Sequence, residues 1–158
     1  MTIIYITGLS GVGTTSALDE LSRKGYKTVD TDYGGYVREV VTDTETAHFL
    51  VEEKMSQLLR SAGDDHLFIS GCCDNQGMFY NEFDVVVLLK AELSTMLDRI
   101  QTRTTNPYGK TPHQQAEIRE NHRTVLPLLE KSADVIIDTT HVSVQEVCRQ
   151  LEALLYNR

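Results

Sequence analysis

A glycine-rich turn between an apolar run and a helix-forming stretch constrains this chain more than any other feature of its sequence. Residues 2–7 (TIIYIT) favour a strand, and Ser16 to Lys24 is typical of a helix. The intervening residues 8–15 (GLSGVGTT) include three glycines. Glycines allow successive backbone N–H groups to converge on one point, and a helix N-terminus adds partial positive charge there. The order strand, glycine-rich loop and helix therefore predicts a backbone cradle for a phosphate group.

The loop has the glycine spacing of the phosphate-binding motif G-x-x-x-x-G-K-[ST], but it lacks the lysine. Thr14 stands at the lysine position, and Thr15 stands where a hydroxyl would face Mg²⁺. Losing the ammonium removes a charge that would follow the γ-phosphoryl group, which costs roughly ten- to hundred-fold in rate if nothing replaces it. Binding survives more easily than turnover, because the backbone N–H groups remain. The residues expected to hold the phosphates are Gly8, Ser10, Gly11, Val12, Gly13, Thr14 and Thr15.

Length and composition narrow the class of protein. The 158 residues, 41% of them hydrophobic, predict a single domain over residues 1–158. A net charge of −8 argues against a nucleic acid polymer as partner, and no apolar run has the length of a membrane span. Three cysteines, two of them adjacent, cannot form a disulfide framework, so we expect a cytoplasmic protein. Residues 99–123 carry a local charge of +3, which favours a small anionic ligand. The oligomeric state stays open.

Strand and helix patterns alternate along the chain, which predicts an α/β fold with a parallel sheet covered on both faces. We expect helix over most of residues 36–60, interrupted near 42–44, and a loop over 106–112. Pro127 is expected to kink a helix over 113–131, and Ser143 to cap the closing helix. The further expected strands are 26–29, 66–70, 84–89 and 135–138, and a further helix is expected over 91–102.

Three more motifs follow the loop in a fixed order: Asp30-x-Asp32 after the second strand, Arg99-x-x-x-Arg103 before a Pro/Gly loop, and Glu117-x-Arg119 after it. With this order the chain resembles the P-loop kinases of the shikimate kinase and adenylate kinase branch, over most of its length. The resemblance implies a three-layer P-loop NTPase fold with a five-stranded parallel sheet in the order 2-3-1-4-5. It also implies a small lid at about residues 103–118, and ATP and Mg²⁺ as ligands.

The resemblance also suggests roles for the charged residues. In that branch the first aspartate lies near the Mg²⁺ shell and the second holds the acceptor hydroxyl, so Asp30 and Thr15 would serve the metal and Asp32 the acceptor. Asp32 could also take the proton of that hydroxyl. The alternative is a turn, because Asp before Tyr-Gly-Gly is good turn chemistry without any ligand.

Arginines of the lid segment are the expected replacement for the missing lysine. Arg103 and Arg119 would close over the phosphoryl group, and Arg99 would contact the nucleotide. Arginines four residues apart on one helix mildly repel each other. The pairs Arg99 with Arg103 and Arg119 with Arg123 have this spacing, and an anion bound between the two pairs would explain it. A solvated helix face is the alternative for each arginine taken singly.

The remaining candidates surround the acceptor and the base. Residues after the third strand face the same crevice of the sheet, and Arg38 lies in the segment that binds the acceptor in related kinases. The expected substrate-binding residues are Asp32, Arg38, Gly71, Asn75 and Gln76. Residues 138–147 resemble the loop near the adenine in that branch, which puts His141 near a bound base.

Two functions follow from these residues. One is an ATP-dependent transferase, a kinase that moves the γ-phosphoryl group to a small metabolite or nucleotide. The other is a non-catalytic nucleotide-binding P-loop module that acts on a partner. Thr14 favours the second, whereas the aspartate pair and the lid arginines favour the first.

Overall fold

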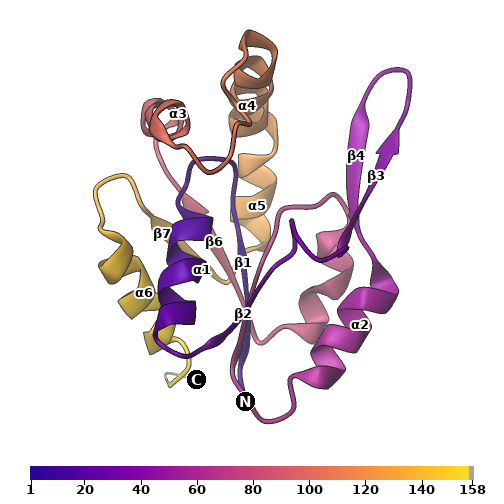
Figure 1. The fold of residues 1–158 in the computed structure, drawn as a ribbon, viewed down its shortest axis with the longest axis vertical. Coiled ribbons are helices and arrows are strands. Elements are labelled where there is room, and N and C mark those ends of the chain that lie inside the picture. The colour runs from indigo at the N-terminus through magenta and orange to yellow at the C-terminus, as the bar shows by residue number, and fades with distance from the viewer. Residues whose placement is uncertain (157–158) are drawn as a thin grey trace.

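The computed structural model describes residues 1–156, which are built around a five-stranded parallel sheet (Figure 1). Its strands lie in the order β2-β5-β1-β6-β7, and every neighbouring pair is parallel. Counted along the chain among the strands of this sheet, the order is 2-3-1-4-5, as predicted. The strands are β1 (Ile3–Thr7), β2 (Lys27–Asp30), β5 (Leu67–Ser70), β6 (Val85–Lys90) and β7 (Val135–Asp138).

The central strand β1 is buried on both faces, which explains why its sequence is apolar throughout. Its side chains alternate between two cores: Ile4 and Ile6 pack into one, Ile3 and Tyr5 into the other. The register places Tyr5 beside Ile69 of β5 and beside Val86 of β6.

Helices cover both faces, so the molecule has the predicted three layers, which Figure 1 shows with the sheet seen edge-on. The core on one face joins the sheet to α1 (Thr14–Arg23), α3 (Leu93–Thr102) and α6 (Val144–Ala153). The other face packs against α2 (Glu52–Ser61), the 3₁₀ helix η1 (Gln76–Glu82) and α5 (Leu126–Ser132). The helix α4 (Pro112–Thr124) stands above the carboxyl edge of the sheet (Figure 1). Within the described range, no helix is long and apolar enough to cross a membrane.

The prediction of helix for most of residues 36–60 is wrong for its first half. Strands β3 (Val37–Val41) and β4 (Thr46–Leu50) form an antiparallel hairpin that projects from the body beside the lid (Figure 1). The Thr42 side chain closes the turn, since its hydroxyl donates to the Glu45 carbonyl and accepts from the Glu45 N–H. Only the second half of the segment is helical, as α2.

The lid segment also departs from prediction at its prolines. Thr111 caps α4 by accepting from the Gln114 N–H, and Pro112 is already its first residue. Instead of one kinked helix, two helices meet at Val125, and Pro127 lies in the first turn of α5, where its missing N–H costs nothing.

Candidate functional site

The glycine-rich loop leaves β1 at Thr7 and enters α1 at Thr14, and its glycines fit their places for different reasons. A side chain at Gly8 would stand 2.5 Å from the Leu89 carbonyl oxygen, and one at Gly11 would stand 2.6 Å from the Met96 carbonyl oxygen. These glycines therefore let the loop pack tightly on β6 and α3. Gly13 has a φ of 98° and open space around it, so the loop is accessible from this side.

The start of α1 offers free backbone donors to this space. Gly13 is the N-cap residue, no side chain caps the helix, and its first turn has no acidic residue. The first N–H groups of a helix have no partner within the helix, and here they lie at the positive end of the helix dipole. The arrangement suits an anion such as a phosphate.

Thr14, in place of the lysine, has a buried side-chain oxygen for which no hydrogen-bond partner exists among residues 1–156. A buried hydroxyl without a partner is uncommon, because its desolvation is not compensated. The next residue, Thr15, is exposed at the mouth of the loop.

Arg99, on α3, is bonded to the glycine-rich loop and to the segment after β7. Its guanidinium donates to the Gly11 carbonyl oxygen at 3.3 Å, to the Thr139 hydroxyl at 3.0 Å and to the Thr139 carbonyl oxygen. Thr139, just after β7 and 3% exposed, in turn donates its hydroxyl to the Val12 carbonyl oxygen at 2.6 Å.

Asp30 and Asp32 lie at the carboxyl end of β2 on the same edge of the sheet as the loop. Asp30 is half-buried, and burial raises the pKa of its carboxyl group. One of its oxygens accepts the Asp32 N–H at 3.0 Å. This bond is the turn chemistry of the alternative interpretation, and the Asp32 side chain is exposed.

Arg103 is engaged with the lid loop itself. Its guanidinium donates to the Asn106 carbonyl oxygen at 3.1 Å and to the Tyr108 carbonyl oxygen at 2.7 Å, and the Lys110 ammonium returns a bond to the Arg103 carbonyl. Arg119 on α4 is exposed. In this conformation Arg103 folds the lid loop, whereas Arg119 makes no hydrogen bond or salt bridge within the described part of the chain.

Two residues expected to bind substrate, Gly71 and Gln76, contact other parts of the protein. A side chain at Gly71 would collide with the Thr31 hydroxyl and stand 2.8 Å from the Tyr5 hydroxyl, so the protein itself fills that space. Gln76, 4% exposed, accepts from the Tyr5 hydroxyl at 2.9 Å and donates to the Thr7 hydroxyl at 3.0 Å. Its amide also joins Cys73 and Tyr80. Gln76 therefore joins the buried strand to η1.

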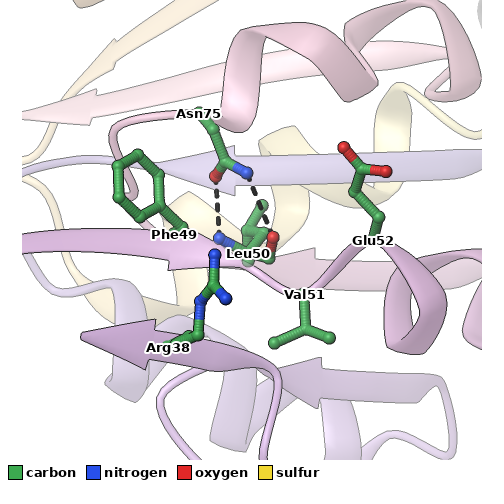
Figure 2. Close-up of a pocket in the computed structure, with 6 residues that line it drawn as sticks. All are labelled: Arg38, Phe49, Leu50, Val51, Glu52 and Asn75. Carbon is green, nitrogen blue, oxygen red and sulfur yellow. Dashed lines mark hydrogen bonds between the residues drawn. The ribbon is translucent and has the colours of Figure 1, made fainter. Parts of the chain in front are cut away.

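Asn75 holds the base of the hairpin. Its side chain accepts the Leu50 N–H at 2.7 Å and donates to the Leu50 carbonyl oxygen at 3.0 Å, the two bonds drawn in Figure 2. Asp74 adds two further bonds to the backbone of His48. The Asn75 side chain thus makes the same pair of hydrogen bonds to β4 that the backbone of an adjacent strand would make.

A cavity of about 330 Å³ lies at this hairpin base, and Arg38 lines it as one of the predicted substrate residues. Figure 2 shows Arg38 reaching from β3 toward Leu50, with Phe49 and Glu52 on either side. Among residues 1–156, neither Arg38 nor Glu52 has a salt bridge. The cavity therefore presents a cation, an anion and an aromatic ring to whatever enters it.

Residues that sequence reasoning missed are Thr139, Phe49 and Glu52. Thr139 follows a buried strand at the carboxyl edge of the sheet, a signal that could have assigned it. No such signal exists for the other two, because they line a cavity made by the unexpected hairpin. His141, two residues beyond Thr139, is exposed.

Sequence comparisons match the chain to one family and to a set of bacterial proteins. The family model described as AAA domain matches residues 4–122. A nucleotide-binding protein of Thermotoga sp. (strain RQ2) is 26% identical over 162 residues, and one of Tolumonas auensis is 26% identical over 154 residues. These matches cover 99% and 96% of this chain but 54% and 52% of the relatives. The chain thus spans about half the length of the curated relatives.

Solved structures share the fold over almost the whole chain. The shikimate kinase of Acinetobacter baumannii, solved with shikimate, superposes with a TM-score of 0.59 and 15% identity, covering 98% of this chain and 93% of that one. The shikimate kinase of Bacteroides thetaiotaomicron gives 0.62 and 16%, with 98% of each chain covered. The predicted P-loop kinase fold of the shikimate and adenylate kinase type is confirmed.

Proposed function

Because the chain belongs to the AAA domain family, we propose that it binds ATP with Mg²⁺ and transfers the γ-phosphoryl group to a small acceptor. The glycine-rich loop lies within residues 4–122, the part of the chain that matches the family. The observation that carries this proposal is the loop over residues 8–15, which has an open Gly13, an uncapped α1 and no acidic residue in the first helical turn. Backbone amides there bind the triphosphate. The names of the curated relatives, nucleotide-binding proteins, support the binding part.

The residues present fit a magnesium ion that is held jointly with phosphates. Mg²⁺ keeps several waters and takes one or two protein oxygens plus substrate phosphates, so it needs no cage of protein ligands. Thr15 would supply its hydroxyl and Asp30 its carboxylate, whose pKa is raised by burial and by the nearby carboxylates Asp32 and Asp19, so a bound cation would favour its charged form. When bound, the ion neutralises charge that develops on the phosphoryl oxygens.

The acceptor would lie between Asp32 and the hairpin. The Asp32 carboxylate orients the acceptor hydroxyl and takes its proton as the oxygen attacks phosphorus. Arg38 and Glu52 line the cavity at the hairpin base and would pair with groups of opposite charge on the acceptor. Arg119 would neutralise phosphoryl charge as α4 approaches, and Arg103 would join it only by leaving the lid loop carbonyls.

Calorimetric titration of ATP with Mg²⁺ tests the binding part, and ADP release with a panel of nucleosides, nucleoside monophosphates, polyols and hydroxy acids tests the transfer. The Asp32→Asn variant is the matched background, with Asp64→Asn in the exposed turn before β5 as control. Acceptor-dependent turnover above the Asp32→Asn background supports the kinase. If no member of the panel gives it, the transfer is refuted; if ATP gives neither heat nor a rise in melting temperature, the binding is refuted too.

A non-catalytic nucleotide-binding module is the second candidate, favoured by Thr14 and by the engagement of Arg103 with the lid loop. Such a module would pass the lid position to a partner. The variant Thr14→Lys separates the two candidates. A binder should gain affinity without any reaction to enhance, whereas an enzyme adapted to Thr14 should gain little or lose rate.

A further inference from the structure

The glycine-rich loop is fixed by side chains that come from outside it. Gly11 approaches α3 so closely that no Cβ fits before the Met96 carbonyl. Arg99, one turn further along α3, bonds the Gly11 carbonyl oxygen, and Thr139 bonds the Val12 carbonyl oxygen. Arg99 and Thr139 are also bonded to each other at 3.0 Å. Two segments separated from the loop by more than 80 residues thus hold two consecutive peptide groups.

Holding a carbonyl group also sets the direction of the next N–H group. In a trans peptide the C=O and the following N–H point in opposite directions, and no cis bond exists among the described residues. The bond from Arg99 therefore turns the Val12 N–H away from the Arg99 guanidinium, and the bond from Thr139 turns the Gly13 N–H away from the Thr139 hydroxyl. Both donors thus point away from the two side chains that hold the loop, and the space beside the Gly13 Cα is open.

Charge supports the same inference. The Arg99 guanidinium carries a positive charge and bonds the loop directly. The lysine position holds Thr14, whose hydroxyl has no partner within residues 1–156. A positive charge in contact with the loop thus comes from α3.

We propose that Arg99 and Thr139 are positioning residues: they form a clamp that orients the loop amides before any nucleotide arrives and supplies from behind the loop the positive charge that Thr14 lacks. The inference rests on the proposed nucleotide binding for its functional meaning. Its structural content, a loop made rigid by two side chains, can be tested without any ligand.

Backbone ¹⁵N relaxation of the nucleotide-free protein tests the clamp directly. The test variants are Thr139→Val and Arg99→Met, and Thr139→Ser keeps the hydroxyl. Arg23→Met, at an exposed arginine paired with Glu20 on α1, is the control. We expect the order parameters of the loop amides at 11–13 to fall from about 0.85 to below about 0.6 in the two test variants only. Loop amides that stay rigid in both would overturn the proposal.

Titration of ADP with Mg²⁺ adds the functional readout. Losing the clamp bonds should weaken ADP binding by about tenfold in Thr139→Val and Arg99→Met, with Thr139→Ser and Arg23→Met within about twofold of the original. Unchanged affinity in both test variants contradicts the clamp. If Thr139→Val does not fold, Arg99→Lys, which keeps the charge but loses the planar fork, must show the loosened loop. If the original protein binds no ADP, the proposed function fails, and relaxation alone decides the clamp.

Discussion

The hydroxyl of Thr14 is buried and has no partner among residues 1–156, at the position where a phosphate-binding loop has its lysine. An unpaired buried hydroxyl costs free energy in the absence of a ligand, and the same hydroxyl gains a partner when a phosphate oxygen comes within reach. The Thr14 hydroxyl therefore lowers the stability of the ligand-free protein but favours the binding of a phosphate.

Replacing Thr14 by valine, which has the same shape, separates the two effects. We expect Thr14→Val to raise the free energy of unfolding by up to about 1 kcal/mol and to weaken nucleotide binding roughly three- to tenfold. Denaturant unfolding and calorimetry measure the two quantities. The exposed Thr15→Val is the comparison, in which no gain of stability is expected. A destabilised Thr14→Val would show that the hydroxyl has a partner after all.

Gly11 combines a φ of 86° with a collision between any added Cβ and the Met96 carbonyl. Gly11→Ala should therefore lower the free energy of unfolding by about 1–3 kcal/mol and weaken nucleotide binding at least tenfold. Gly25→Ala is the matched control, because Gly25 has a φ of 95° but open space around it. The Gly25→Ala variant therefore measures only the free-energy cost of placing alanine at a positive φ. Equal losses in the two variants would contradict a tight contact between the loop and α3.

Burial raises the pKa of Asp30, so this carboxyl protonates at a higher pH than an ordinary aspartate. The charged form of Asp30 is disfavoured in the folded state, so the contribution of Asp30 to the free energy of unfolding falls as the pH rises through its raised pKa. The affinity for Mg²⁺ changes in the opposite direction and rises with pH, because only the carboxylate binds Mg²⁺.

We therefore expect the Mg²⁺-dependent part of nucleotide affinity to decline as the pH is lowered, before the ordinary aspartate range is reached. Titrations with and without Mg²⁺ between about pH 7 and pH 5 measure it. Asp30→Asn should weaken the Mg²⁺ effect and flatten its pH dependence, while Thr15 and the phosphates still hold the ion. A Mg²⁺ effect and a pH dependence that both stay unchanged in this variant would exclude Asp30 as a ligand.

At the scale of elements, the β3–β4 hairpin depends on the loop after β5 rather than on the main sheet. A two-stranded ribbon is marginally stable alone, and here its base is held by the Asn75 amide and by Asp74. Val41, near its tip, is 72% exposed. The hairpin should accordingly open independently of the body of the molecule.

Asn75→Leu removes both bonds to Leu50 and should speed hydrogen exchange in β3 and β4 by about ten- to hundred-fold, while β1 and β5 remain protected. Exchange followed by mass spectrometry resolves the segments. The exposed Asn81→Leu on η1 serves as control. Uniform acceleration across the sheet would instead mean that Asn75 stabilises the whole domain.

The hairpin was also the main failure of sequence interpretation at this scale. Val37, Val40 and Val41 favour a strand, and Thr42 closes its turn, but the polar stretch that follows suggested a helix break rather than a reversal. Strands of the main sheet were predictable, because each is short and bounded by turn residues, and all but β2 are mainly apolar. The cavity with Phe49 and Glu52 could not be predicted, since it exists only once the two strands pair.

The sequence predicted the edge of the sheet at which the candidate residues lie, but it predicted neither their hydrogen-bond partners nor the contacts of Thr139. The carboxyl edges of β1, β2, β5 and β7 bring the loop, the aspartates, Asn75 and Thr139 to one side of the sheet, which the strand order already implies. Whether a side chain there faces a ligand or another part of the protein depends on contacts between distant segments. Gln76, bonded to Thr7 across 69 residues, is an example.

At the scale of the whole molecule, a ligand that binds only the folded state raises stability by mass action. At 100 times the dissociation constant the gain is about 2.7 kcal/mol, which for a chain of 158 residues corresponds to a rise in melting temperature of roughly 5–10 °C. Thermal unfolding with ATP and Mg²⁺ should show this shift, and the Gly11→Ala variant should show about half of it or less. A shift of the same size in both would place the nucleotide elsewhere.

The threonine at position 14 has one more consequence, for chemical labelling. Acylating reagents built on a nucleotide find their target in a primary amine beside the terminal phosphate, and the hydroxyl here reacts far more slowly with them. A survey of cell extracts with such probes would leave this loop unmodified even when ATP fills it. Lysine acetylation could not block the loop either, because residues 8–15 contain no lysine.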